Sequence, residues 1–350
     1  MLKKIMFLVC SSVIFIAYTG MAAEVSMPES PVTPAVPKAL AAVAKLKPKD
    51  FPRKPLELVV AYPPGGGMDV TERVLGKHLE KYVGGKCIIV NKPGGFAVVG
   101  HAWLASNAPK DGYTIAIISS KILSDTVFHS GNKWSYKDLT GLGFINFSPV
   151  YWVVNSKSKF AGKSAKEIIE IAKANPGSVK LAVNKESPFE YLALKIQVVT
   201  GAAFNIIPFQ GGTPGMVALL GDHVDMASGY LTEFKSHLDA GNFKMVAVSD
   251  MQEDPLAPGI PTFNSILGRD DIYFGAWRYA AVPKGVPADR IKFLEAAIDA
   301  ALRDPGLAKD FEATGAIVGP QFLSGAATDA RLDKIFASDS ALYKTLKLAP

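Results

Sequence analysis

The chain has 350 residues, of which 49% are hydrophobic and 20% are charged, with 31 glycines and 24 prolines. This composition is typical of a soluble globular protein, and it excludes a disordered chain, a disulfide-stapled miniprotein, a collagen-like chain and a coiled coil. The formal charge of +6 is spread without a dense basic run, so we expect no nucleic-acid partner.

The first predicted element is a cleaved secretory signal peptide at residues 1–23. Two lysines precede an apolar stretch at 5–17, and small residues suited to signal peptidase follow it. One alternative is a retained membrane anchor, for which the stretch is short. Another is a lipid on Cys10, where the preceding residue is larger than usual. We therefore predict a periplasmic protein.

A tether is predicted at residues 24–50, where the composition changes to Pro, Ala, Val and Lys. Its prolines at Pro28, Pro31, Pro34 and Pro37 are three residues apart, which is the period of polyproline II. We interpret this segment as a semi-rigid spacer without a specific function.

The segment after the tether alternates strands and helices. Predicted are strands at 56–61, 87–90 and 113–119, helices at 70–82 and up to 103, and glycine turns at 62–67 and 93–95. Such alternation favours a mainly parallel sheet covered on both faces. Cys87 is interpreted as a buried strand residue, because after signal cleavage it would have no second cysteine to pair with.

A second α/β unit begins after a strand at 150–155. Ser164 and Glu167 form a capping box that starts its first helix. Further strands are predicted at 179–183, 204–209, 223–228, 243–249 and 279–282, and long helices at 290–302 and 329–346.

These elements together predict an α/β fold of two lobes with a ligand cleft between them. The first lobe comprises residues 51–155 and 276–350, and the second comprises residues 156–275. The lobes are expected to close about a hinge near Val154 and Tyr279.

Common catalytic motifs are absent from the sequence. There is no H-E-x-x-H, no paired C-x-x-C and no G-x-S-x-G, and the 5 histidines are scattered without ligand spacing. We therefore predict no catalytic residue, no metal site and no cofactor.

Two glycine turns join strands to helices, one in each predicted lobe. After the first turn, Asp69 is expected to be the N-cap of the helix, and Glu72 to complete a capping box. After the second, Thr213 is expected to be the N-cap, with Pro214 at the first helical position. The glycines either only allow tight turns or expose free N–H groups to a bound anion. Because the turns occur as a pair, we favour a clamp for a carboxylate.

The predicted binding site combines these turns with polar residues just beyond other strand ends. Its members are Tyr62, Pro64, Gly65, Gly66, Gly67, Met68, Asp69, Ser119, Ser120, Asn184, Lys185, Ser187, Gly211, Gly212, Thr213 and Tyr230.

Several blocks resemble a known family, the Bug-type periplasmic receptors of tripartite tricarboxylate transporters. The matching blocks, in order, are residues 62–69, 91–95, 111–114, 208–214, 219–225 and 281–287. The resemblance implies a type II periplasmic binding fold, a Venus flytrap that closes on a small organic acid. It also implies that the loops at 63–69 and 210–213 hold a ligand carboxylate through backbone groups and water. The implied partner is a separate membrane permease, and a sensor kinase is a second candidate.

The sequence departs from the family pattern near the expected site. Met68 replaces a small residue, and residues 184–187 replace a glycine-rich loop. The ligand's identity therefore stays open. A ligand sensor or adaptor, and a secreted enzyme acting on an organic acid, are the alternatives to a transport receptor.

Overall fold

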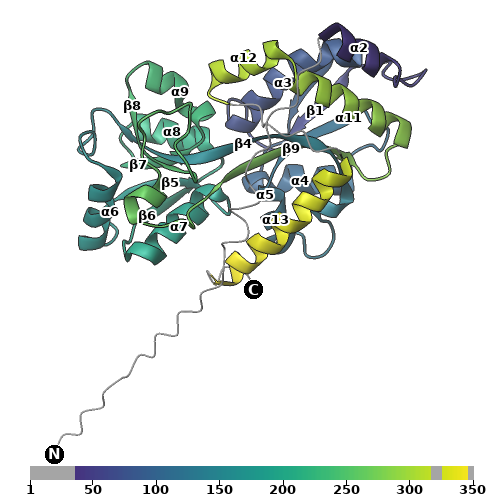
Figure 1. Ribbon diagram of the computed structural model, residues 1–350. Coiled ribbons are helices and arrows are strands. Elements are labelled where there is room, and N and C mark those ends of the chain that lie inside the picture. Colours follow the sequence, from purple (N-terminus) through teal and green to yellow (C-terminus); the bar gives the residue numbers. More distant parts are fainter. Residues whose placement is uncertain (1–35, 317–324, 346–350) are drawn as a thin grey trace, which may run out of the picture.

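The computed structural model describes residues 36–316 and 325–345, and these form two α/β lobes joined by two long strands, β4 (Leu139–Asn155) and β9 (Gly275–Pro283) (Figure 1). The first lobe also contains α2 (Val36–Ala44), β1 (Leu56–Val60), α3 (Gly67–Val83), β2 (Cys87–Asn91), α4 (Val98–Ser106), β3 (Thr114–Ser119), α5 (Lys121–Phe128), α11 (Ala288–Leu302), α12 (Pro305–Thr314) and α13 (Gly325–Thr345). Short 3-10 turns precede α4 and β4, at η1 (Gly95–Ala97) and η2 (Tyr136–Asp138).

The second lobe contains α6 (Ala165–Ala174), β5 (Lys180–Asn184), α7 (Pro188–Thr200), β6 (Asn205–Phe209), α8 (Gly212–Leu220), β7 (Met226–Gly229), α9 (Leu231–Asp239), β8 (Phe243–Ser249) and α10 (Phe263–Leu267). The strand at 223–228 is thus shorter than predicted, and β9 is longer. The capping box that starts α6 is confirmed: Ser164 Oγ accepts from Glu167 N at 3.3 Å, and Glu167 Oε2 accepts from Ser164 N at 2.8 Å.

The strands of both lobes form one continuous series of hydrogen-bonded neighbours. Their order is β2-β1-β3-β9-β4-β7-β5-β6, and β8 also pairs with β4. The first part of β4 pairs with β9, up to Pro149 opposite Gly275, and its second part pairs with β8 from Val150 onward. Proline has no N–H to donate to a ladder, which suits a position where the partner strand changes. The crossing between lobes therefore lies at Pro149, whereas the predicted hinge residues Val154 and Tyr279 are buried inside the second and first lobe.

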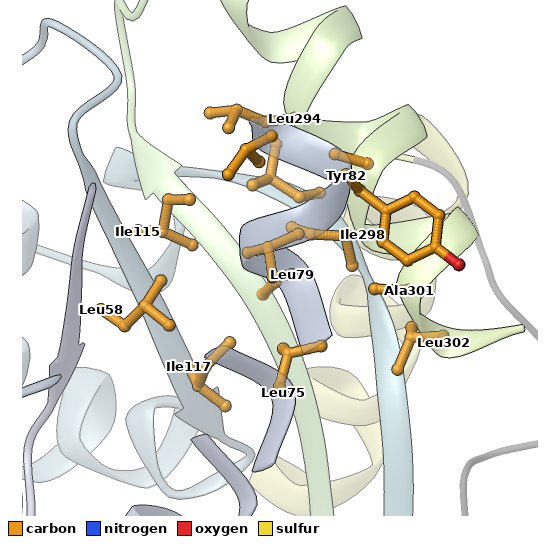
Figure 2. Close-up of a cluster of buried hydrophobic side chains, with 14 of the residues drawn as sticks. Leu58, Leu75, Leu79, Tyr82, Ile115, Ile117, Leu294, Ile298, Ala301 and Leu302 are labelled. Carbon is orange, nitrogen blue, oxygen red and sulfur yellow. The ribbon is translucent and has the colours of Figure 1, made fainter. Parts of the chain in front are cut away.

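The sheet of the first lobe is buried on both faces. Ile115 and Ile117 of β3 point toward α3 and α11, where they join Leu79 and Leu294 in one core cluster (Figure 2). Ala116 and Ile118 alternate with them and belong to the cluster on the opposite face. The second lobe repeats this arrangement, because alternate residues of β4 enter separate clusters. Burial on both faces explains why the strands read as continuous apolar runs.

The tether prediction is wrong in its second half. Residues 36–44 form α2, which packs on α3 and α11, and Val43 is only 2% exposed. Alanine, leucine and valine at this position favour a helix once a neighbouring core can bury its apolar face. The predicted signal peptide and the prolines at 28, 31 and 34 lie outside the described residues.

Among the described residues, no helix is both long and apolar enough to cross a membrane. Cys87, at the start of β2, is partly buried and unpaired, and burial raises the pKa of its thiol to about 12. This thiol is therefore protonated and unreactive at neutral pH.

Candidate functional site

A cavity lies between the two lobes, where the glycine turns of both lobes meet. It measures about 30 Å³, room for about two water molecules. Its walls are Tyr62, Pro63, Gly66, Gly67, Met68, Ser119, Lys121, Asn184, Ser187, Pro188, Phe189, Gln210, Gly211, Gly212, Thr213, Pro214, Tyr230 and Glu233.

The glycine turn of the first lobe begins α3 earlier than predicted. Gly66 is the N-cap, and no side chain caps it. Asp69 instead accepts from Gly65 N at 2.9 Å, from Arg73 Nε at 2.8 Å and from Asn91 Nδ2 at 2.9 Å. Burial would raise the pKa of Asp69, but these hydrogen bonds outweigh it and hold the pKa below its ordinary value. Asp69 is therefore an ionised residue that fixes the loop without lining the cavity.

The predicted capping box at this helix is wrong, because Glu72 does not reach back to the N-cap. The Glu72 side chain is fully buried one turn into α3, and neither of its carboxyl oxygens has a hydrogen-bond partner among the described residues. Burial, and then the negative charge of Asp69, raise the pKa of Glu72 well above its ordinary value. Burial without a partner thus favours the protonated, neutral form of Glu72.

The glycine turn of the second lobe begins α8 two residues earlier than predicted. Gly211 is the N-cap with a φ of 105°, a conformation open to glycine, and α8 starts at Gly212. Thr213 consequently lies in the first turn, where its buried hydroxyl has no partner in the described part of the chain. The first N–H groups of α8 have no intrahelical acceptor, so this helix end is open to an anion in the cavity.

Glu233 of α9 occupies the space between the two turns. Its Oε1 accepts from Gly67 N at 3.3 Å, and its Oε2 accepts from Tyr230 N at 3.0 Å. Glu233 also lies against Gly212, because a Cβ added to this glycine would be only 2.2 Å from Glu233 Oε2. Burial raises the pKa of Glu233, and the two N–H donors and Arg278 partly offset that increase. A carboxylate of the protein thus accepts a hydrogen bond at the start of α3 and also lies against the start of α8.

Arg278 of β9 lies fully buried behind the cavity wall. Its Nη1 donates to Asn146 Oδ1 at 3.3 Å and to Ser148 Oγ, and its Nε donates to Met68 Sδ at 3.2 Å. The guanidinium also lies 4.9 Å from the ring centre of Tyr230. Its Nη2 has no acceptor among the residues described. Met68 therefore lines the cavity and contacts a buried cation through its sulfur.

A buried ionic cluster supports another part of the wall. Asp125 of α5 accepts from His101 Nδ1 at 2.6 Å and from Lys121 Nζ at 2.5 Å, and all three side chains are at most 1% exposed. Lys121 lines the cavity, next to the hydrogen-bonded pair of Tyr62 Oη and Ser119 Oγ, which are 3.0 Å apart.

The second lobe contributes an amide and two aromatic rings to the wall. Asn184, at the end of β5, is 5% exposed, and its Oδ1 has no partner within the described ranges. The ring centres of Phe189 and Tyr230 are 4.6 Å apart. A buried oxygen without a hydrogen bond lowers the stability of a folded protein. The Asn184 Oδ1 atom therefore indicates that a polar molecule binds beside it.

Hydrogen bonds between the lobes flank the cavity. Phe96 N donates to Gln210 Oε1 at 2.9 Å, and Ser124 Oγ donates to the Glu186 carbonyl at 3.1 Å. The Glu186 carboxylate also pairs with His129. Phe96 and Glu186 have φ values of 55° and 53°, which are unfavourable for residues with side chains, so these contacts hold both loops in strained conformations.

Asp125, His129 and Glu186 each place one possible metal-binding atom within 4.8 Å of the others. The Lys121 ammonium already occupies the Asp125 carboxylate, and a second cation would be repelled there. We therefore assign no metal to this cluster.

Most residues of the predicted site line the cavity. The exceptions are Pro64, Gly65, Asp69, Ser120 and Lys185, of which Lys185 is exposed and lies 3.7 Å from Glu186. The cavity wall also contains Pro63 and Gln210, which lie in the loops implied by the family resemblance, and Lys121, Pro188, Phe189, Pro214 and Glu233, which were not predicted. Pro63, Gln210 and Pro214 adjoin predicted members, whereas Lys121, Phe189 and Glu233 lie within helices and carry no local signal.

Comparison with known proteins gives a consistent result. A family model described as "Tripartite tricarboxylate transporter family receptor" matches residues 71–319. The chain is 30% identical over 270 residues to the protein BugT of Bordetella pertussis, an alignment that covers 76% of this chain and 82% of BugT.

Two solved structures share the arrangement of the lobes. The periplasmic binding protein BugD has a TM-score of 0.79 at 23% identity, over 85% of this chain and 99% of BugD. An R. palustris protein solved with adipate has a TM-score of 0.79 at 22% identity, over 86% of this chain and all of that protein, 100%. These likenesses confirm the predicted two-lobed periplasmic binding fold.

Proposed function

The chain belongs to the family of tripartite tricarboxylate transporter receptors, and from this premise we propose that it captures a small organic carboxylate between its two lobes and delivers it to a membrane transporter of that type. One observation carries the proposal: the uncapped start of α8 opens onto the interlobe cavity, with the unpartnered Thr213 hydroxyl in its first turn. Free N–H groups and the helix dipole bind a carboxylate at such an end.

Capture requires the lobes to separate and then close on the ligand. Motion about the crossing at Pro149 would open the cavity, and the contacts of Gln210 and Glu186 with the first lobe would re-form on closure. A ligand that binds the closed form shifts the population toward it, and a permease can recognise that form. We place the protein in the periplasm, as an export signal would require, and without catalytic activity.

Thermal melting against a panel of organic acids tests this proposal. The mature chain is melted with mono-, di- and tricarboxylates, aromatic acids and neutral controls. A ligand that binds only the folded state at 100 times its Kd stabilises that state by about 2.7 kcal/mol, so the matching acid is expected to raise the Tm in a dose-dependent way.

Two outcomes would contradict the proposal. One is a panel in which only neutral or cationic compounds without a carboxylate raise the Tm. The other is conversion of the bound acid to a new compound at substoichiometric protein, because a receptor returns its ligand unchanged.

A further inference from the structure

The Glu233 carboxyl group lies in a space that three glycines leave open. Its Cδ, Oε1 and Oε2 atoms are all within 2.3 Å of the position that a Cβ on Gly212 would take, so the group packs directly on the backbone where α8 begins. Oε2 is also 3.4 Å from the corresponding position on Gly229. On the other side, Oε1 accepts from Gly67 N at 3.3 Å, where α3 begins. The Glu233 carboxyl group therefore lies between the two uncapped helix starts, where the ligand's carboxylate is expected to bind.

We propose that the Glu233 carboxylate competes with the ligand for this position, so that an acid must displace the Glu233 side chain in order to bind. The inference rests on the proposed function, because it concerns the same site. Glu233 then sets the specificity of the site. A small anion that makes no further contact with the cavity wall cannot compete with a carboxylate attached to the protein, whereas a larger acid gains such contacts.

A second capping box in the same lobe shows which contact of Glu233 exceeds a capping role. Glu167 is the third residue of α6, as Glu233 is of α9, and its Oε2 accepts from Ser164 N at 2.8 Å. Glu167 is exposed, and its contacts with Ser164 stay within one turn. Glu233 uses Oε2 for the equivalent bond to Tyr230 N but directs Oε1 to the other lobe, at Gly67 N. Capping requires only one of the two oxygens. The contact between lobes is therefore a separate feature of Glu233.

Arg278 provides a partner for the displaced carboxylate. Its side chain is fully buried, and its Nη2 has no acceptor in the described part of the chain. Arg278 Nη2 and Glu233 Cγ lie 3.2 Å and 3.4 Å from the position that a Cβ on Gly67 would take, so rotation of the Glu233 side chain can bring an oxygen to the guanidinium. The bond to Gly67 N that must break is 3.3 Å long, beyond the usual range of about 2.7–3.2 Å. A charge-assisted bond to Arg278 would replace it.

Formate, the smallest carboxylate, tests whether Glu233 occupies an anion position. Glu233→Ala removes the carboxyl group and leaves the N–H groups of both helix starts, so formate can take its place. We expect sodium formate to raise the Tm of Glu233→Ala by at least about 2 °C relative to sodium chloride, both at about 100 mM so that ionic screening is equal. The Tm of the wild type should be the same in the two salts, because its own carboxylate holds the position.

Two further variants make the formate test specific. Glu167→Ala removes the corresponding acid of α6, which lies outside the cavity, and its Tm should be the same in formate and in chloride. This control separates a position within the cavity from the general effect of an uncapped helix. Glu233→Ser vacates the same position with a residue that also suits a helix start, so it replaces Glu233→Ala if the alanine variant does not fold.

A crystal structure of the wild type with the acid that gives the largest melting shift adds a measurement that needs no variant. We expect the carboxylate of that acid to accept from the backbone N–H groups of Gly67 and Gly212, and the Glu233 side chain to lie beside Arg278 Nη2. A structure in which the acid is bound in the cavity while Glu233 still accepts from Gly67 N would overturn the competition between them.

The outcomes separate the inference from the function on which it rests. If formate leaves the Tm of Glu233→Ala unchanged, or raises that of the wild type or Glu167→Ala equally, Glu233 does not hold an anion position. The carboxylate receptor still stands in that case, provided that an acid of the panel stabilises the wild type. If neither formate nor any acid of the panel stabilises the wild type or Glu233→Ala, both proposals fail.

Discussion

Asp125→Asn is expected to lower the free energy of unfolding by about 3–5 kcal/mol, the cost of leaving a buried charge without its partner. Asp125 is fully buried and accepts from both His101 and Lys121. The asparagine keeps the size of the side chain but removes the charge. The buried Lys121 ammonium would then remain without a counterion, beside the cavity.

The pH dependence of stability gives this prediction a second readout. Burial would raise the pKa of Asp125, but the His101 hydrogen bond and the Lys121 charge outweigh it and hold the pKa below its ordinary value. A carboxyl with a lowered folded-state pKa stabilises the protein above its unfolded pKa of about 3.9, and the stabilisation is lost as the pH falls. The wild type should therefore lose more stability than Asp125→Asn between about pH 5 and pH 2.

A double variant is the control for this cluster. Most of the loss comes from the uncompensated Lys121 charge, so Asp125→Asn combined with Lys121→Met, which removes both charges, should recover most of the lost stability. Urea unfolding of the wild type, both single variants and the double variant measures the coupling. A loss below about 1 kcal/mol for Asp125→Asn, or additive single effects, would show that the cluster does not act as a unit.

Glu72→Met is expected to stabilise the protein by about 1–3 kcal/mol at pH 8, which is the cost of a buried polar group without partners. Glu72 is 0% exposed, and its carboxyl oxygens have no hydrogen bond within the described residues. Because its folded-state pKa is raised, the protein with Glu72 loses stability as the pH rises from about 4.3 through that pKa. The stabilisation produced by Glu72→Met should therefore be larger at pH 8 than at pH 5.

Glu80→Met on the same helix is the matched control, for which we expect the opposite change in stability. Glu80 accepts from Lys86 Nζ at 2.9 Å and from Cys87 N at 3.1 Å, and these partners lower its pKa. Its replacement should weaken the protein slightly instead of stabilising it. Denaturant titrations at pH 5 and pH 8 check both variants, and a Glu72→Met protein less stable than wild type at pH 8 would mean that the acid has a favourable partner.

Much of the fold follows from short-range sequence patterns. The strands at 180–184 and 205–209 are apolar or β-branched runs that end at polar or glycine-rich turns, so their positions and the α/β alternation could be predicted. The helix at 36–44 was missed because its alanines and Pro37 fit either an extended tether or a helix. Only its packing on α3 and α11 decides between them.

The site was predictable where it is formed by strand ends and turns. Glycines such as Gly65 and Gly211 stand out because the turns after their strands need positive φ values, 81° and 105°. Glu233 and Lys121 could not be found in this way. Glu233 is the third residue of α9, where an acid is typical of an N-terminal cap, and only the approach of the other lobe makes it part of a cavity wall. The helix starts were misplaced because a glycine N-cap leaves no side-chain signal.

Calorimetric titration of the acid that gives the largest melting shift tests the central claim, capture within the interlobe cavity. Wild type is compared with Asn184→Leu, which replaces the unpartnered amide on the cavity wall, and with Lys185→Leu, one residue along and exposed outside it. We expect one ligand per chain, an affinity at least about 10-fold lower in Asn184→Leu, and the wild-type affinity in Lys185→Leu, because each lost buried hydrogen bond costs about 1–3 kcal/mol. Equal affinity in wild type and Asn184→Leu, or a loss confined to Lys185→Leu, would contradict binding in this cavity.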